Sequence, residues 1–299
     1  MKQSYIKYIS SLLLFGSNGI VASFIPMSSY EIVLLRTMIG SLLLIAIFFL
    51  SKSKFTFYQH KKQFAFLFAS GIAMGASWMF QYEGYQQVGI SITSLCYYCG
   101  PVIIMVLSPI IFKEKITWVK MVGLLSTIFG IFLVNGQELE SSGNLWGIFC
   151  GVMTAVMYAF MIILNKQAKN ITGLENAMFQ LFVSFLTTAV FVGMKQGYAM
   201  HIEKASIVPI FILGLINTGI GCYLYFSSIG NLPAQTVAIC DYLEPLSAIV
   251  CSIIILKEVM VSIQVVGAVF IISGAIFGEC FKKLSTKTIS VKKHKNKVC

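Results

Sequence analysis

The sequence predicts an all-α integral membrane protein with ten transmembrane helices, built as two five-helix repeats of inverted topology. Three observations support this prediction. Hydrophobic residues make up 57% of the chain and charged residues 11%, far from the balance of soluble domains. Apolar stretches long enough to cross a hydrocarbon core of ~30 Å recur along the chain. Residues 82–136 also align with residues 226–280 at a fixed offset of 144 without a gap.

The apolar stretches define the expected spans in order. They cover residues 6–25, 31–50, 64–82, 90–112, 117–135, 144–165, 175–194, 206–228, 234–256 and 262–281. The first stretch resembles a cleaved signal peptide, but the sixth span is its counterpart in the repeat, so we expect it to be retained. The first repeat then occupies residues 1–137, the second 144–281, and a basic tail 282–299.

The aligned positions of the two repeats are helix-breaking or helix-ending residues. Pro101 falls on Pro245, Gly123 on Gly267 and Gly130 on Gly274, and Lys113-Glu114 falls on Lys257-Glu258. Because five spans per repeat is an odd number, the second repeat enters the membrane from the opposite side. Inverted repeats of this kind are typical of transporters that work by alternating access.

The lysine distribution predicts the orientation. With the N-terminus in the cytoplasm, 18 Lys lie near inner span ends or in the tail, and only Lys195, Lys204 and Lys257 lie outside. We therefore expect both termini in the cytoplasm, and the Lys-rich, Arg-poor composition suggests a bacterial inner membrane. This bias and the tail account for the net charge of +11 without nucleic acid. The lipid bilayer and a small-molecule substrate are the expected partners.

The sequence lacks the motifs of an enzyme or a metalloprotein. Six of the eight cysteines lie inside predicted spans, where they are interpreted as small packing residues. The histidines, His60, His201 and His294, lie in loops or in the tail, and no nucleophile elbow, phosphate loop or acidic metal cluster is found. We expect no catalytic activity, cofactor or metal.

Three charged residues lie at membrane depth, where a charge is costly unless it is paired or hydrated: Arg36, Asp241 and Glu244. At ~1.5 Å per residue, Arg36 lies ~8 Å from the outer surface and Glu244 ~15 Å from the inner surface. In a core of ~30 Å the remaining gap is ~7 Å, which an arginine side chain can span. A structural ion pair and a substrate or proton role both explain this placement.

Asp241 and Glu244 share one face of the ninth span, beside Pro245. Since proline cannot donate a hydrogen bond, Pro101 and Pro245 predict a kink with an exposed carbonyl in the fourth and ninth spans. The repeats diverge here, because Asp241 aligns with Tyr97 and Glu244 with Gly100, whereas Arg36 aligns with Gln180. Divergence is expected of a site for one asymmetric substrate.

These residues resemble the drug/metabolite transporter superfamily, in its EamA branch of ten-helix carriers. The resemblance covers nearly the whole chain except the tail. It rests on the duplicated unit, on Gly16-Ser17-Asn18, on Arg36, and on a mid-span proline followed thirteen residues later by Glu114 or Glu258.

The resemblance implies a central cavity between the halves and a carrier of a small metabolite. The candidate substrate-binding residues are Asn18, Trp78, Gln81, Tyr82, Tyr97, Tyr98, Tyr158, Tyr223, Tyr225, Asp241, Tyr242 and Glu244. An aromatic cavity with two carboxylates suits a solute with an amine, such as an amino acid. We expect export of such metabolites, with Glu244, and then Asp241, as candidates for proton coupling. Structural or gating roles are assigned to Arg36, Pro101, Pro245, Glu114 and Glu258.

Other functions stay open at this stage. The same acids would serve a polyspecific efflux pump for cationic drugs, and relatives of this kind also carry nucleosides or S-adenosylmethionine. Facilitated diffusion without protons is compatible with the same residues. A non-transporting scaffold is disfavoured because the polar groups lie at mid-membrane depth.

Overall fold

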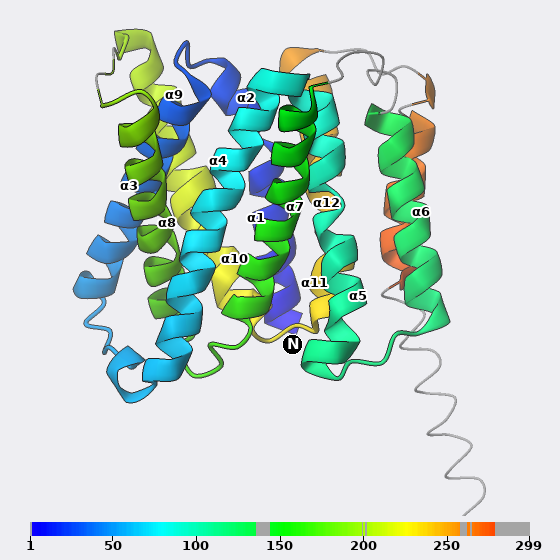
Figure 1. The fold of residues 1–299 in the computed structure, drawn as a ribbon, viewed down its shortest axis with the longest axis horizontal. Helices are drawn as coiled ribbons and strands as arrows, with labels where there is room; N and C mark the ends of the chain where they lie inside the picture. Colours follow the sequence, from blue (N-terminus) through cyan, green and yellow to red (C-terminus); the bar gives the residue numbers. More distant parts are fainter. Residues whose placement is uncertain are drawn as a thin grey trace, which may run out of the picture.

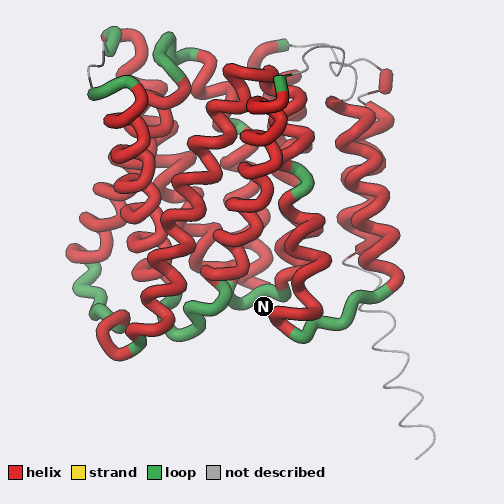
Figure 2. Tube along the Cα trace, in the orientation of Figure 1, coloured by secondary structure: helices red, strands yellow, loops and turns green. Residues whose placement is uncertain are grey.

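The computed structural model describes residues 2–135, 144–198, 200, 202–257, 262–263 and 265–278. All regular secondary structure in this part of the chain is helical, as predicted, and the helices stand side by side between a lower and an upper end (Figures 1 and 2). In the first half they are α1 (Lys2–Gly16), α2 (Asn18–Ser23), α3 (Ser29–Leu50), η1 (Phe57–Gln59), α4 (Lys61–Tyr97), α5 (Gly100–Phe112) and α6 (Trp118–Asn135). The second half contains α7 (Leu145–Asn165), α8 (Gly173–Lys195), η3 (Lys204–Ser206), α9 (Ile207–Phe211), the π-helix η4 (Ile212–Ile220), α10 (Gly221–Ile229), α11 (Ala234–Cys240), α12 (Leu243–Cys251), the π-helix η5 (Ser252–Leu256) and a last helix, Val265–Gly278.

Seven helical segments in the described residues are long and apolar enough to cross a membrane. They are Ser29–Leu50, Lys61–Gly89, Ile92–Phe112, Leu145–Asn165, Gly173–Lys195, Lys204–Ile229 and Ala234–Ile255. The fifth and tenth predicted spans correspond to the shorter apolar helices Trp118–Leu133 and Val265–Gly278. The first predicted span is divided between α1 and α2.

The predicted end of the third span at residue 82 is wrong. The helix continues through Val88 to Gly89, whose φ of 84° lies in the left-handed region that favours glycine and turns the chain. The polar residues in this stretch resemble a loop in sequence. They are helical because Glu83 and Gln87 bind each other, with Gln87 Nε2 donating to Glu83 Oε1 at 3.1 Å.

The kinks predicted at the two prolines are short breaks in the structure. Tyr98 and Cys99 separate α4 from α5, and Asp241 and Tyr242 separate α11 from α12. Pro101 and Pro245 then lie in the first turn of the following helix, where a missing N–H costs little. The expectation of an exposed carbonyl at residue 241 is wrong, because Asp241 O accepts from Glu244 N at 3.0 Å. At the break, the carbonyl of Asp241 accepts its hydrogen bond from the residue three positions later, in a tighter turn than an α-helix.

Residues separated by the repeat offset touch each other. The Tyr242 hydroxyl donates to Tyr98 O at 3.0 Å, and Ser126 Oγ donates to Phe270 O at 3.0 Å. The second pair joins α6 to the last helix, which approach closely through glycines. A Cβ at Gly123 would lie 2.7 Å from the carbonyl oxygen of Gly274. These two contacts between equivalent positions of the two halves are here called the axis contacts.

The lysines are distributed unevenly between the two ends of the bundle. The N-terminus and the loops 51–60, 113–117 and 166–172 lie at the lower end in Figure 1. The segment 196–206 lies at the upper end. The lower end therefore carries most of the lysines of the described loops: Lys2, Lys7, Lys52, Lys54, Lys113, Lys115, Lys166 and Lys169.

Candidate functional site

A pocket lies in the middle of the bundle, where the helices of both halves meet. It has an empty volume of about 620 Å³, which includes the open space at its mouth. Its walls come from α1, α2, α3 and α4 on one side and from α7, η4, α10 and α12 on the other. The lining residues are Phe15, Asn18, Arg36, Met74, Ser77, Trp78, Tyr97, Tyr158, Met161, Thr218, Cys222, Tyr225, Phe226 and Glu244.

Irregular backbone brings two polar residues to this pocket. The first span breaks after Gly16, and Asn217 Nδ2 binds at the break by donating to Leu14 O at 2.9 Å and to Ser17 Oγ at 2.7 Å. Asn18 begins the next helix, and Thr218 follows Asn217 in the π-helix η4, a geometry that often marks functional sites. Asn18 Oδ1 and Thr218 Oγ1 are buried and find no hydrogen-bond partner in the described residues. Unpaired buried polar atoms in a pocket point to a ligand.

Arg36 enters the pocket from α3 and is only 6% exposed. Its guanidinium carbon lies 4.4 Å from the centroid of the Trp78 ring, which is a cation–π contact. Its Nε has no hydrogen-bond partner among the described residues. Within the described residues, the only salt bridge joins Lys195 to Glu83. Arg36 therefore has no carboxylate oxygen within 4 Å in this part of the chain.

The two acids of the ninth span have different surroundings. Glu244 lines the pocket, interacts electrostatically with Arg36, and accepts no side-chain hydrogen bond within the described part of the chain. Asp241 is 7% exposed and lies behind the lining, where its two oxygens accept the hydroxyls of Tyr8 and Tyr158. Glu244 is therefore the acid within reach of a solute.

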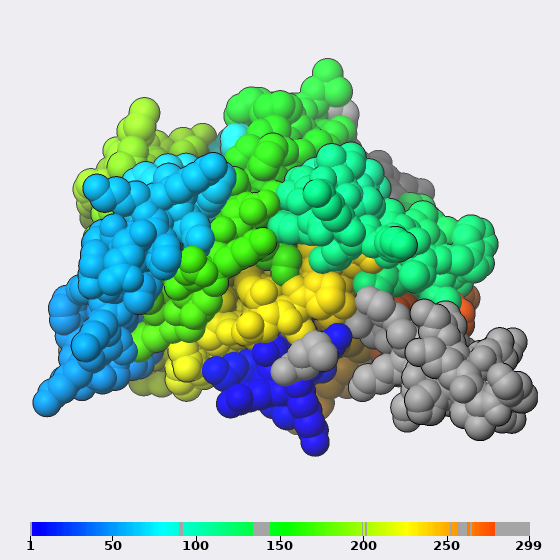
Figure 3. Space-filling view, turned by 90° about the horizontal axis from the view of Figure 1, so that it is seen from below, coloured from blue at the N-terminus to red at the C-terminus, as the bar shows by residue number. Residues whose placement is uncertain are grey.

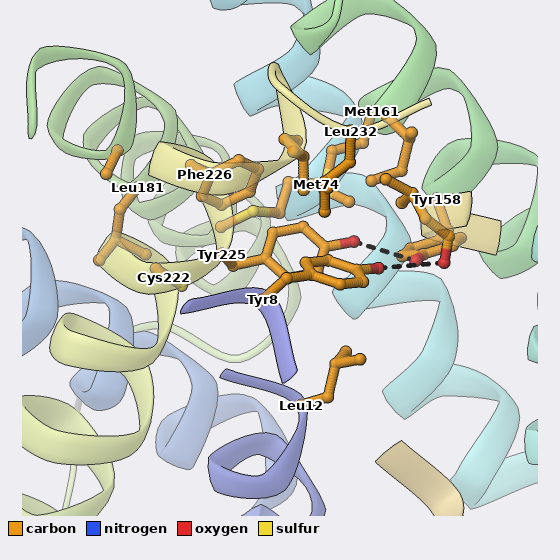
Figure 4. Close-up of a cluster of buried hydrophobic side chains, with 14 of the residues drawn as sticks. Tyr8, Leu12, Met74, Tyr158, Met161, Leu181, Cys222, Tyr225, Phe226 and Leu232 are labelled. Carbon is orange, nitrogen blue, oxygen red and sulfur yellow. Dashed lines mark hydrogen bonds between the residues drawn. The ribbon is translucent and has the colours of Figure 1, made fainter. Parts of the chain in front are cut away.

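A tyrosine cluster connects the pocket to Asp241. Tyr158 and Tyr225 both line the pocket, and their hydroxyl oxygens are 3.1 Å apart. The rings of Tyr8 and Tyr225 lie side by side with centroids 5.2 Å apart, and their hydroxyls point toward Tyr158 (Figure 4). A group that binds at Tyr158 thus contacts a residue that also holds Asp241.

The pocket gathers Asn18, Arg36, Trp78, Tyr97, Tyr158, Tyr225 and Glu244 of the residues singled out in the sequence. Other candidates lie elsewhere. Gln81 donates to the Tyr85 hydroxyl at 2.7 Å, and Tyr223 lies under Lys7 with 5.3 Å from Nζ to the ring centroid. Tyr82 packs against a second buried cluster, near Tyr30. Tyr98 and Tyr242 meet at the axis contacts, where Tyr242 is 0% exposed.

Several lining residues have no signal in the sequence. They are Phe15, Met74, Ser77, Met161, Thr218, Cys222 and Phe226. Each lies on a span rich in similar residues, so its position depends on which helix face meets the pocket.

A polar cluster at the upper end also escaped sequence reasoning. Glu83 is buried and accepts from Lys195 Nζ at 3.0 Å, from Gln87, from Trp146 Nε1 at 3.4 Å and from the Tyr30 hydroxyl. This single carboxylate ties α3, α4, α7 and α8 together.

The lower end is held by contacts to the turn between α10 and α11. Glu114 caps α11, since its carboxylate accepts from Ala234 N at 2.7 Å and Gln235 N at 3.1 Å. Lys166 donates to Ile229 O at 2.9 Å and to Leu232 O. Burial lowers the pKa of Lys166 to about 8, and the nearby Glu114 charge opposes this shift. Glu258, the counterpart of Glu114, lies outside the described residues.

This turn covers the lower face of the molecule. In the view from below, the yellow segment that contains it fills the space between the blue α1 and the green α7 (Figure 3). Glu114 and Lys166 therefore hold a turn whose Leu232 belongs to the same buried cluster as Tyr158 and Met161 of the pocket.

The described cysteines are free thiols, Cys96 and Cys99 included. No group of three His, Cys, Asp or Glu side chains suited to a metal ion is found in the described ranges. The chemistry of the pocket is that of a binding site: one cation, one anion, unpaired hydrogen-bonding atoms and aromatic walls.

Comparison with known proteins agrees with this arrangement. Residues 3–136 and 145–278 each match the model of the EamA-like transporter family. The uncharacterized transporter YxxF of Bacillus subtilis is 24% identical over 276 residues, covering 90% of this chain and 87% of the relative. The uncharacterized transporter YetK of the same organism is 23% identical over 291 residues, covering 94% of this chain and 87% of the relative.

A solved crystal structure shares the fold. It superposes with a TM-score of 0.80 over 94% of this chain and 98% of its own length, at 13% identity. The family model matches the chain twice, once in each half, and the pocket lies where the halves meet. The chain therefore belongs to the EamA-like transporter family and is a multi-pass, all-helical membrane transporter of small molecules rather than an enzyme.

Proposed function

We propose that this chain is a secondary transporter that exports amino acids or related amine-bearing metabolites by alternating access. The observation that carries the proposal is the central pocket, in which Glu244 lies free of hydrogen-bond donors among aromatic residues. A carboxylate binds an ammonium group, and aromatic faces add cation–π attraction and apolar contact.

The axis contacts support an arrangement of ten spans in two inverted repeats. Residues 144 positions apart touch at Tyr98–Tyr242 and at Ser126–Phe270, as expected if a two-fold axis relates the halves. The excess of lysines at the lower end supports a cytoplasmic N-terminus in a bacterial inner membrane. In this orientation the α10–α11 turn lies on the cytoplasmic side.

We further propose that transport is coupled to protons through Glu244. A coupling carboxylate must be accessible to the substrate at one step of the cycle and to water at another. Glu244 lines the pocket, whereas Asp241 lies behind it and is hydrogen-bonded to two tyrosines. Binding of an ammonium group and binding of a proton at Glu244 would then exclude each other. The ionisable groups that act on Glu244 are Arg36, Asp241, Tyr85, Tyr97, Tyr98 and Tyr225.

The test is transport by purified protein in liposomes, with and without an imposed pH gradient. We expect uptake of a labelled amino acid to respond to the gradient in the wild type and to lose that response in Glu244→Gln. Glu203→Gln, which removes an exposed acid outside the pocket, is the control. Full gradient dependence in Glu244→Gln would contradict the coupling role.

A polyspecific efflux pump for cationic drugs is the second candidate, favoured by the aromatic lining and Glu244. It differs in selectivity, because a lipophilic cation such as tetraphenylphosphonium would then compete strongly with amino acids. Arg36 in the same pocket disfavours such a cation. Competition by dye cations in the liposome assay distinguishes the two functions.

A further inference from the structure

Arg36 is a buried cation without a counter-ion in the described part of the protein. Its side chain is 6% exposed, its Nε has no hydrogen-bond partner, and the one salt bridge in the described residues is Lys195–Glu83. Glu244 lines the same pocket and acts on Arg36 only at longer range. If the two residues formed a structural ion pair, the guanidinium of Arg36 would contact the carboxylate of Glu244 directly. Arg36 and Glu244 instead line one pocket without forming a salt bridge to each other.

The surroundings of Arg36 fix the group rather than neutralise it. The Trp78 ring lies 4.4 Å from the guanidinium carbon, so an apolar ring packs against the group. The Nε–H has no partner in the described residues, and the N–H edge of a guanidinium matches a carboxylate in a two-point contact. A lysine at this position would offer a point charge without that geometry.

The unpaired polar atoms of the pocket complement this edge. Asn18 Oδ1 is a hydrogen-bond acceptor, and the Thr218 hydroxyl both donates and accepts. With Glu244, the pocket offers acceptors for an ammonium group in addition to the single guanidinium. The rings of Phe15, Trp78 and Phe226 supply apolar wall for the rest of a solute.

We propose that Arg36 binds an anionic group of the substrate, so that the transported molecule is a zwitterion with its carboxylate on Arg36 and its ammonium group toward Glu244. This inference rests on the proposed function and narrows its substrate class. Molecules with only the amine leave Arg36 buried without a partner. Molecules with only the carboxylate leave Glu244 without a positively charged partner from the substrate.

The test compares three charge forms of one side chain. Phenylalanine, phenylalaninamide and 3-phenylpropionate carry both charged groups, only the amine, and only the carboxylate, and leucine and methionine with their analogues extend the panel. Binding is measured by ligand-dependent thermal stabilisation of the detergent-purified protein and by competition in liposomes. We expect the zwitterions to bind about 10- to 100-fold more tightly than either single-charge analogue, as charge-assisted hydrogen bonds allow.

The variants separate the role of each charge. Arg36→Gln should weaken the zwitterion about 10- to 100-fold and leave the amide unchanged, whereas Glu244→Gln should weaken the zwitterion and leave the carboxylate analogue unchanged. If Arg36→Gln does not fold, Arg36→Lys keeps the charge but loses the two-point geometry, and it should weaken the zwitterion while leaving the amide unchanged. Lys204→Gln removes an exposed cation outside the pocket and is the control.

The results distinguish this inference from the proposed function. An equal loss for zwitterion and amide in Arg36→Gln, or equal binding of both by the wild type, would overturn the carboxylate role while transport of amines stands. Binding of none of the three charge forms by a folded wild-type protein would overturn both.

Discussion

The close contact between α1 and α12 at Gly16 gives a sharp prediction about the pocket. A Cβ at this position would lie 1.7 Å from Ser247 Oγ, 2.6 Å from Ala248 N and 2.8 Å from Glu244 O. The serine side chain can rotate away, but the two backbone atoms cannot. Gly16→Ala therefore forces the start of α12, which carries Glu244, away from α1.

The size of this effect follows from the distances. Ordinary contacts begin at 3.4 Å, so the two backbone atoms must each move by about 0.6 to 0.8 Å. Overpacking of this kind costs roughly 1–3 kcal/mol. A displacement of Glu244 by this amount also lengthens its hydrogen bond to a bound solute. We expect both a lower unfolding temperature and weaker substrate binding.

The assay is thermal unfolding of the purified protein with and without the best-binding zwitterion. Gly19→Ala is the matched control, because a Cβ there meets nothing within 4 Å and the residue lies in the same region of the first span. Equal unfolding temperatures and equal affinities for Gly16→Ala and Gly19→Ala would refute the reasoning.

Three further predictions concern the two ends of the bundle. Glu114→Ala removes the cap of α11 and should lower stability by about 0.5–2 kcal/mol in chemical unfolding, whereas Glu203→Ala should not. Lys166 has a pKa lowered to about 8 from 10.5 in the folded protein, so the unfolded chain binds more protons between these values. Stability should therefore rise with pH across this window, and the rise should be smaller in Lys166→Met; an unchanged pH profile would contradict the burial of the ammonium group. Glu83→Ala leaves the Tyr30 hydroxyl unpaired at 2% exposure and should cost about 1–3 kcal/mol in the wild type but less in a Tyr30→Phe background, as a double-mutant cycle would measure.

Much of the fold could be predicted from the sequence because the bilayer imposes simple rules. Apolar length and the repeat offset predict the helices, and the mid-span prolines predict interruptions at nearly the right places. Depth along the spans also places Arg36 and Glu244 within ~7 Å of each other in height, and both line the same pocket. These inferences depend on distance along an axis, which the sequence specifies directly.

The remaining features depend on helix rotation and on partners far away in the chain. Tyr98 and Tyr242 are as deep as Tyr158, yet they meet each other at the axis contacts instead of the pocket. Thr218 lines the pocket because it lies in a π-helix, and no residue pattern in the sequence predicts that helix. Glu83 looks like a loop residue until Tyr30 and Lys195 are brought to it. The periodicity of the sequence predicts that a helix has an apolar face. It does not predict which neighbouring helix packs against that face.

The axis contacts have a mechanical consequence for alternating access. When two halves related by a two-fold axis exchange their conformations, atoms on the axis keep their partners while distant atoms change theirs. The hydrogen bond from Ser126 Oγ to Phe270 O is one of these contacts and joins α6 to the last helix. Under the proposed alternating-access mechanism, this helix pair stays in place while the pocket-lining helices turn around it. A covalent link between positions 126 and 270 should leave the transport cycle running, whereas a link across the pocket should stop it.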